Sequence, residues 1–112
     1  MSTIILRGGV IINEGSRIEA DLLIKDGRIE KIASSISVEG NVEEVHLNGK
    51  LILPGWIDDQ VHFREPGLTH KGNIQTESRA AVAGGITSYM EQPNTKPAAT
   101  TIEELEKKYH RA

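Results

Sequence analysis

The sequence predicts an α/β protein in two parts: a small β-sandwich-type domain over residues 1–53 and, over residues 54–112, the first two βα units of a parallel sheet or barrel. Short apolar segments separated by Gly and Asn turns fill the first part. After Pro54-Gly55 the pattern changes to strand, loop, helix, strand, loop, helix, which is typical of βα units. The chain has 112 residues, whereas a complete (β/α)₈ barrel needs roughly 250. Any barrel is therefore expected to be incomplete in this chain.

Six short strands are expected in the first part, because each segment is apolar or alternates between apolar and polar residues. Two tight hairpins are expected, at Asp26-Gly27 and Asn48-Gly49, since Asn, Asp and Gly adopt positive φ at low cost at both central positions of such a turn. The expected strands are Thr3–Leu6, Val10–Ile12, Ala20–Ile24, Arg28–Ile32, Glu44–Leu47 and Lys50–Leu53.

The second part is expected to begin with a strand over Trp56–Phe63 and to contain another over Ile86–Glu91. Between them Asn73 can cap the start of a helix that runs to about residue 83. Gly84-Gly85 is placed to end this helix in the left-handed conformation.

A last helix is expected from Thr101, which forms a capping-box pattern with Glu104. The pattern predicts an amphipathic helix that reaches the final residue. The apolar face would consist of Ile102, Leu105 and Tyr109, and the i, i+4 ion pairs would be Glu103–Lys107 and Glu104–Lys108.

Composition and charge exclude several classes of partner. Thirteen Lys and Arg against sixteen Asp and Glu give a net charge of -3, and the basic residues are scattered, so neither nucleic acid nor an anionic membrane is an expected partner. No apolar run approaches the roughly 18 residues of a membrane span, and the start lacks the pattern of a signal peptide. Without cysteine, a metal would be held by His, Asp, Glu or neutral oxygen ligands, and a cytoplasmic setting is favoured.

Chemistry-bearing residues concentrate in the segment from Pro54 to Gly67. Four of them alternate and are expected to share one side of the strand end: Asp58, Gln60, His62 and Arg64. In a (β/α)₈ barrel, inward side chains at the carboxyl end of the first strand line the active site. A buried face of four polar groups has no cheap structural explanation, so this face is expected to hold a metal and an anionic substrate.

The motifs His62-Phe-Arg-Glu-Pro-Gly67, Ala83-Gly-Gly-Ile-Thr87 and Pro93-Asn-Thr95 closely resemble those of dihydroorotases in the amidohydrolase superfamily. The resemblance runs from about residue 50 to residue 100. Residues 1–50 resemble, more loosely, the small β-domain that precedes the barrel in many cyclic amidohydrolases. The implied fold of residues 54–112 is the start of a TIM-type, metal-dependent hydrolase barrel. Allantoinases and dihydropyrimidinases share parts of these motifs. They generally lack the combination of the motif at His62–Gly67 with the motif at Pro93–Thr95.

The resemblance implies reversible hydrolysis of dihydroorotate to N-carbamoyl-aspartate in pyrimidine biosynthesis, with one or two zinc ions per active site and metal-bound hydroxide as nucleophile. The first-strand motif of the family has two metal-binding histidines, two residues apart. His62 matches the position of the second, and Gln60 stands at the position of the first. An amide oxygen is a poorer zinc ligand than imidazole. Arg64 and Asn94 fall on positions that bind the substrate carboxylate, and Asp58 on an acidic residue that supports or tunes the site. The catalytic base and the remaining ligands would come from later strands.

Each of these residues also has a structural interpretation. His62 could be a structural histidine, Gln60 a core amide or a weak ligand, and Arg64 the partner of Glu65 or Glu91 in a surface ion pair. Asn94 could cap or turn the Pro-rich loop. The histidines expected to face solvent are His46, His70 and His110.

Three functional hypotheses follow. In the first, the chain is the N-terminal part of a dihydroorotase that acts on a small molecule, dihydroorotate or N-carbamoyl-aspartate, and is inactive by itself. In the second, Gln60 marks a non-catalytic homologue that serves as a structural partner of a carbamoyltransferase. In the third, the 112-residue chain is a truncated product without activity. Another cyclic amidohydrolase, such as an allantoinase, is a further alternative to the first. A homo-oligomer is compatible with each of them.

Overall fold

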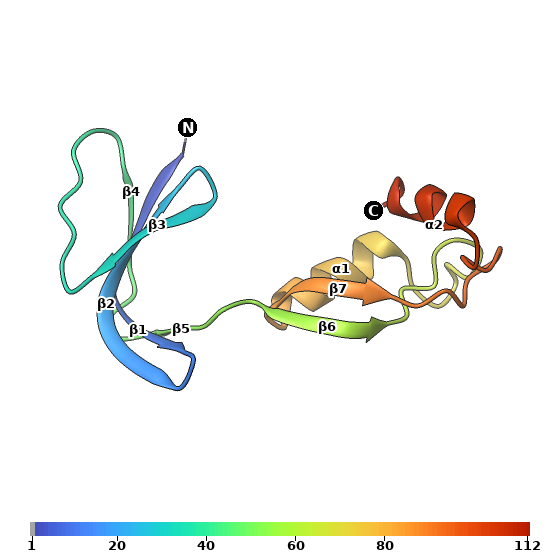
Figure 1. Cartoon of the computed structure of the whole chain (residues 1–112), viewed down its shortest axis with the longest axis horizontal. Coiled ribbons are helices and arrows are strands. Elements are labelled where there is room, and N and C mark those ends of the chain that lie inside the picture. The colour runs from blue at the N-terminus through green and yellow to red at the C-terminus, as the bar shows by residue number, and fades with distance from the viewer. Residues whose placement is uncertain (1) are drawn as a thin grey trace. The chain divides into compact units, whose positions relative to one another are not determined.

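The computed structural model describes residues 2–112, and these form two compact units, one ending at Pro54 and the other beginning at Gly55 (Figure 1). The fold is α/β and consists mostly of strands. Among residues 2–112, neither helix has the length and apolar character needed to cross a membrane.

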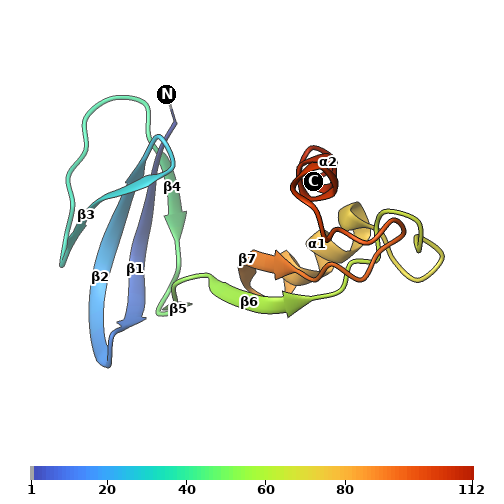
Figure 2. The same cartoon turned by 45° about the vertical axis from the view of Figure 1, so that its right-hand side comes forward.

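The first unit is built on a five-stranded sheet in the order β3-β2-β1-β4, with β5 also paired to β1. The pairs β1–β2 and β2–β3 are antiparallel, whereas β4 and β5 run parallel to β1. β1 and β2 lie side by side in both Figure 1 and Figure 2. The strands are β1 (Thr3–Asn13), β2 (Ser16–Lys25), β3 (Arg28–Ala33), β4 (Glu43–His46) and β5 (Leu51–Ile52).

The hairpin at Asp26-Gly27 is confirmed: the two residues have φ of 50° and 75°, and Lys25 pairs with Arg28. A second hairpin, at Glu14-Gly15, was not expected; its φ values are 48° and 73°. The local signal was weaker there, because glutamate is not among the residues that favour positive φ.

The hairpin expected at Asn48-Gly49 is wrong. Both residues have positive φ, 51° and 79°, but the flanking strands β4 and β5 pair with β1 and not with each other. The reason is that β1 is one long strand, with an irregularity between Leu6 and Gly9 where two strands were expected. Its free edge therefore accepts β4 and then β5 in succession. Gly9 lies close to this edge: a Cβ atom there would lie 2.6 Å from Ile52 Cδ1, so any larger residue would displace that side chain.

A charged cluster ties the sheet to the segment after β3. The buried Asp21 accepts hydrogen bonds from the Gly8 amide (3.0 Å), the Ile36 amide (3.1 Å) and Arg7 Nη1 (3.0 Å). Arg7 also donates two hydrogen bonds of 2.7 Å to the Glu44 carboxylate. The hydrogen bond from the Gly8 amide, and then those from Ile36 and Arg7, lower the pKa of Asp21 below its ordinary value of 3.8.

The first prediction concerns acid stability. A carboxylate whose pKa is lowered by folding stabilises the fold above its unfolded pKa, and this contribution is lost as the pH falls through the folded pKa. Asp21→Asn should therefore lower the melting temperature at pH 7, and the variant should lose less of its remaining stability between pH 5 and pH 2 than the parent. Circular dichroism melts measure both effects. Asp26→Asn, at an exposed turn position, is the control. Equal acid sensitivity in parent and Asp21→Asn would contradict the prediction.

The second unit is a two-stranded parallel sheet with two helices. Asp58 pairs with Tyr89 and Val61 with Glu91, and α1 lies along β7 in Figures 1 and 2. Val61 and Phe63 pack with Ile74 of α1 in a small core. The first strand ends at Val61, two residues earlier than expected. The elements are β6 (Trp56–Val61), α1 (Ile74–Ala83), β7 (Ile86–Glu91) and α2 (Ile102–Tyr109).

The predicted start and end of α1 are confirmed. Asn73 Oδ1 accepts a hydrogen bond of 2.9 Å from the Thr76 amide in a capping box. At the other end Gly84 is still right-handed and Gly85 takes the left-handed conformation with φ of 91°.

Two expectations for α2 are wrong. It starts after Thr101 as predicted, but it ends at Tyr109 with His110 as its C-cap. The i, i+4 ion pairs Glu103–Lys107 and Glu104–Lys108 do not form. Instead Lys107 pairs with Glu104 at 2.7 Å, and Lys108 pairs with Glu91 of β7. The apolar residues Ile102, Leu105 and Tyr109 remain exposed.

Candidate functional site

The candidate site lies in the second unit, where the carboxyl ends of β6 and β7 meet. His62 directly follows β6, and Asn94 lies three residues beyond the end of β7. Their side chains are in contact, with His62 Nδ1 2.9 Å from Asn94 Oδ1. The carboxyl ends of parallel strands are where α/β proteins bind ligands. The structure thus brings together two of the predicted site residues, 32 positions apart in the sequence.

With Asn94 Oδ1 as the acceptor of this contact, His62 Nδ1 is the donor. In a neutral ring Nε2 then carries the lone pair. A metal-binding histidine commonly donates its other ring N–H to an oxygen in this way. His62 is exposed within residues 2–112. Asn94 keeps its Nδ2 hydrogens for a further acceptor.

The two loops that carry these residues pack closely on each other. The Lys96 amide donates to the Pro66 carbonyl at 3.0 Å. Gly67 has φ of 80°, and any side chain on it would collide with the Lys96 carbonyl. Glu65 anchors the first loop, because its Oε2 accepts from the Ile74 amide at the start of α1 (3.0 Å). The His62–Asn94 contact is therefore held by main-chain contacts on both sides.

Arg64 lies in the first loop, half-buried, with φ of 70°. The surface ion pair considered for it is not formed: Glu65 bonds the start of α1, and Glu91 bonds the Phe63 amide and Lys108. Within residues 2–112, Arg64 has no ion-pair partner.

The expectation of a buried face of four polar groups is wrong. Gln60 and His62 are exposed, and they alternate with the buried Val61 and Phe63. Within residues 2–112, Gln60 is not buried. Asp58 is half-buried, and its Oδ1 accepts from the Gln60 amide at 3.0 Å, so this carboxylate fixes the backbone at Gln60. The pairing of β6 with β7 is irregular between Asp58 and Val61, and the last pair, Val61 with Glu91, lies directly before His62.

Residues 2–112 do not by themselves supply a metal site. In this part of the chain no three His, Asp or Glu side chains gather as ligands of one ion. One imidazole, that of His62, lies at the strand ends with a free nitrogen. Structural and catalytic zinc sites need three or four protein ligands, so the donor set in this part of the chain is incomplete. His46, His70 and His110 are exposed, as expected.

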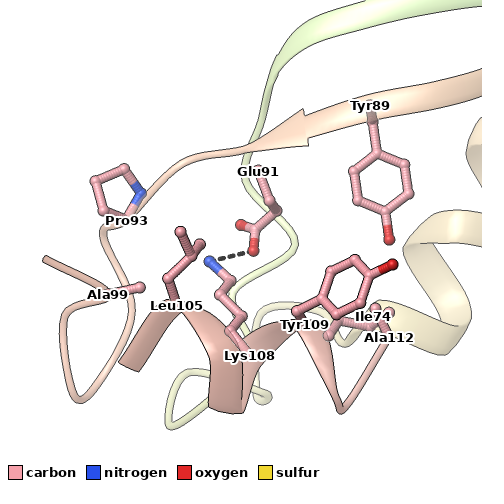
Figure 3. A pocket seen from close by; sticks show the side chains of 9 residues that line it. All are labelled: Ile74, Tyr89, Glu91, Pro93, Ala99, Leu105, Lys108, Tyr109 and Ala112. Atoms are coloured by element: carbon pink, nitrogen blue, oxygen red, sulfur yellow. Dashed lines mark ion pairs between the residues drawn. The ribbon is translucent and has the colours of Figure 1, made fainter. Parts of the chain in front are cut away.

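A buried ion pair next to the site was not predicted from the sequence. Lys108 of α2 reaches Glu91 at the end of β7, and their side chains are 7% and 11% exposed (Figure 3). The available signal was the helical spacing, since Lys108 follows Leu105 by three positions and lies on the same side of the helix. Local ion-pair rules favoured Glu104 as its partner instead.

Comparison with solved structures identifies the class of protein. L-hydantoinase (dihydropyrimidinase) from Arthrobacter aurescens matches with a TM-score of 0.87 at 33% sequence identity, over 97% of this chain and 25% of that one. The second unit, with its paired strand ends, thus belongs to a fold found in cyclic amidohydrolases.

A family model described as Dihydro-orotase-like matches residues 49–112. Similar curated proteins include the dihydroorotase of Bacillus cytotoxicus, 44% identical, and that of Bacillus thuringiensis (strain Al Hakam), 42% identical. Each match covers 95% of this chain and 24% of the relative, so the chain spans about a quarter of their length. The chain belongs to the dihydroorotase-like family, and the allantoinase and carbamoyltransferase-partner hypotheses are not favoured.

Proposed function

We propose that this chain is the N-terminal part of a dihydroorotase, an enzyme that reversibly hydrolyses dihydroorotate to N-carbamoyl-aspartate in pyrimidine biosynthesis in the cytoplasm. Residues 1–53 would be its small β-domain, and residues 54–112 the first two βα units of its barrel. The single observation that carries the proposal is the His62–Asn94 contact at the joined ends of two parallel strands, inside the segment that matches the family.

In this proposal Arg64 and Asn94 bind the carboxylate of the substrate. A guanidinium group offers two parallel N–H donors to a carboxylate, and Asn94 Nδ2 adds a third, since Oδ1 is occupied by His62. The half-buried position of Arg64 limits competition from water. The absence of an ion-pair partner within residues 2–112 leaves the guanidinium for an external anion.

His62 would contribute one zinc ligand through Nε2, with the other ligands supplied by the rest of the longer protein. When bound, zinc would activate water for attack on the cyclic amide. Asp58 would hold the backbone at Gln60, two residues before the ligand. Gln60 would face the site as a weak ligand at most.

The second prediction tests the role of Arg64 in a protein that includes the remaining barrel. Arg64→Lys keeps the charge but loses the bidentate geometry, so kcat/KM for dihydroorotate should fall about a hundredfold, roughly the 2–3 kcal/mol of a charge-assisted hydrogen bond. Most of the loss should appear in KM.

A matched control is Arg79→Lys, the same exchange at an exposed position of α1, which should leave the kinetics unchanged. The uncarboxylated analogue dihydrouracil separates binding from chemistry. If Arg64→Lys slowed any residual hydrolysis of dihydrouracil as much as that of dihydroorotate, the carboxylate-binding role would be wrong.

A further inference from the structure

A buried side chain of helix α2 is bonded to the end of β7, next to the candidate site. Lys108 is the buried residue of α2, at 6% exposure. Its Nζ pairs with Glu91 Oε2 (Figure 3). The same Nζ donates to the Gln92 carbonyl oxygen at 2.8 Å. The apolar residues of the same helix, Leu105 and Tyr109, are 57% and 79% exposed. The ammonium group, and not an apolar core, is thus the buried contact of α2.

Through its two partners, this ammonium group is linked to both segments of the site. Glu91 Oε1 accepts a hydrogen bond from the Phe63 amide at 3.0 Å, and Phe63 stands between His62 and Arg64. The other acceptor of Lys108, the Gln92 carbonyl, lies two residues before Asn94. The Phe63 ring also packs on Tyr89 of β7, with centroids 4.6 Å apart.

The physical consequence follows from the burial of the pair. Removing one partner of a buried ion pair leaves the other charge uncompensated in a poorly solvated place. Without Lys108, the Glu91 carboxylate would turn toward water and release the Phe63 amide. The chain on either side of Phe63 would then lose its fixed distance from the loop that carries Asn94.

We propose that Lys108 is a positioning residue: through the Glu91 carboxylate and the Gln92 carbonyl it holds the His62–Arg64 segment against the Asn94 loop. The relevance of Lys108 to catalysis rests on the proposed function. Its role in holding the His62–Arg64 segment in place does not. The structure therefore allows a test that needs neither substrate nor metal.

The test uses NMR on the 112-residue chain labelled with ¹⁵N in Phe and His. The chain has one Phe and four His, so the Phe63 amide gives a single signal, and Asn94→Ala identifies the imidazole signals of His62. The variant is Lys108→Met, which keeps the length of the side chain and removes the charge. The matched control is Lys107→Met, the same change at a neighbouring exposed position.

In Lys108→Met we expect the Phe63 amide proton to shift upfield and the ratio of Nδ1–H to Nε2–H tautomer in neutral His62 to fall about two- to tenfold, as for the loss of one hydrogen bond. Lys107→Met should leave both signals as in the parent. A folded Lys108→Met chain with both signals unchanged would overturn the proposal.

A second variant covers the case in which Lys108→Met unfolds the second unit. Glu91→Gln combined with Lys108→Met leaves no buried charge, and the amide oxygen can still accept from Phe63. The proposal expects this double variant to fold with a lowered tautomer ratio at His62, because the link to Gln92 is missing. A ratio equal to that of the parent would overturn it. Neither the Phe63 amide signal nor the His62 tautomer ratio depends on dihydroorotase activity. A failure of the proposed function would therefore appear in the activity assay and leave these two measurements unaffected.

Discussion

The 112-residue chain is expected to hydrolyse no dihydroorotate above the buffer rate, with zinc supplied or without it. Residues 2–112 bring one imidazole to the strand ends and no group of three metal-binding side chains. The curated relatives are about four times as long, and no catalytic base is assigned in this quarter. The loss relative to a chain that includes the remaining barrel should therefore be complete within the assay.

The measurement is the absorbance of dihydroorotate over time, with a chain extended to the full length of the relatives as the positive control. Turnover by the 112-residue chain that disappears in His62→Ala would contradict the prediction, since it would show that this part of the protein is sufficient for catalysis. Turnover that survives His62→Ala would indicate a contaminant.

Features determined by neighbouring residues could be predicted from the sequence. The hairpin at Asp26-Gly27, the Asn73 cap and the left-handed Gly85 each depend on the conformational preferences of two to four consecutive residues. The change near residue 54, from strands alone to alternating strands and helices, was visible as a change in the sequence pattern. These preferences act in the unfolded chain as well as in the fold.

Features that depend on long-range pairing could not be predicted. The turn at Asn48-Gly49 has the expected backbone conformation, but whether its flanking strands pair with each other depends on the free edge of β1, some forty residues away. The same holds for the ion pair of Lys108. Helical spacing predicted Glu104 as its partner, but Lys108 pairs with Glu91, 17 positions earlier. Burial of Lys108 against β7 gives that pair a less screened interaction than an exposed helical pair has.

The candidate site was predicted in part. Alternation along the strand placed Gln60 and His62 on one side, in agreement with the burial of Val61 and Phe63 between them. The contact between His62 and Asn94 could not be derived from spacing, because it depends on how the loops after β6 and β7 pack at Gly67 and Lys96. The roles of Arg64, Asn94 and Asp58 remain proposals.

The largest expected change in zinc content concerns Gln60. In a protein that includes the remaining barrel, we expect about one tightly held zinc ion per active site, because a neutral amide oxygen does not replace the donation of an imidazole. Gln60 is exposed at the end of β6, and its backbone is fixed by Asp58. Gln60 and His62 are both exposed and are separated by the buried Val61.

Gln60→His should therefore raise the zinc content toward two ions per active site, measured by elemental analysis of parent and variant after the same dialysis. Gln75→His, the same substitution at an exposed position of α1, controls for zinc bound by any added surface histidine and should leave the content at one. The expected increase in zinc content depends on Gln60 occupying the position of the missing histidine ligand. Two zinc ions in the unmutated protein would contradict this argument, because Gln60 or a ligand beyond residue 112 would then be performing the role of the absent histidine.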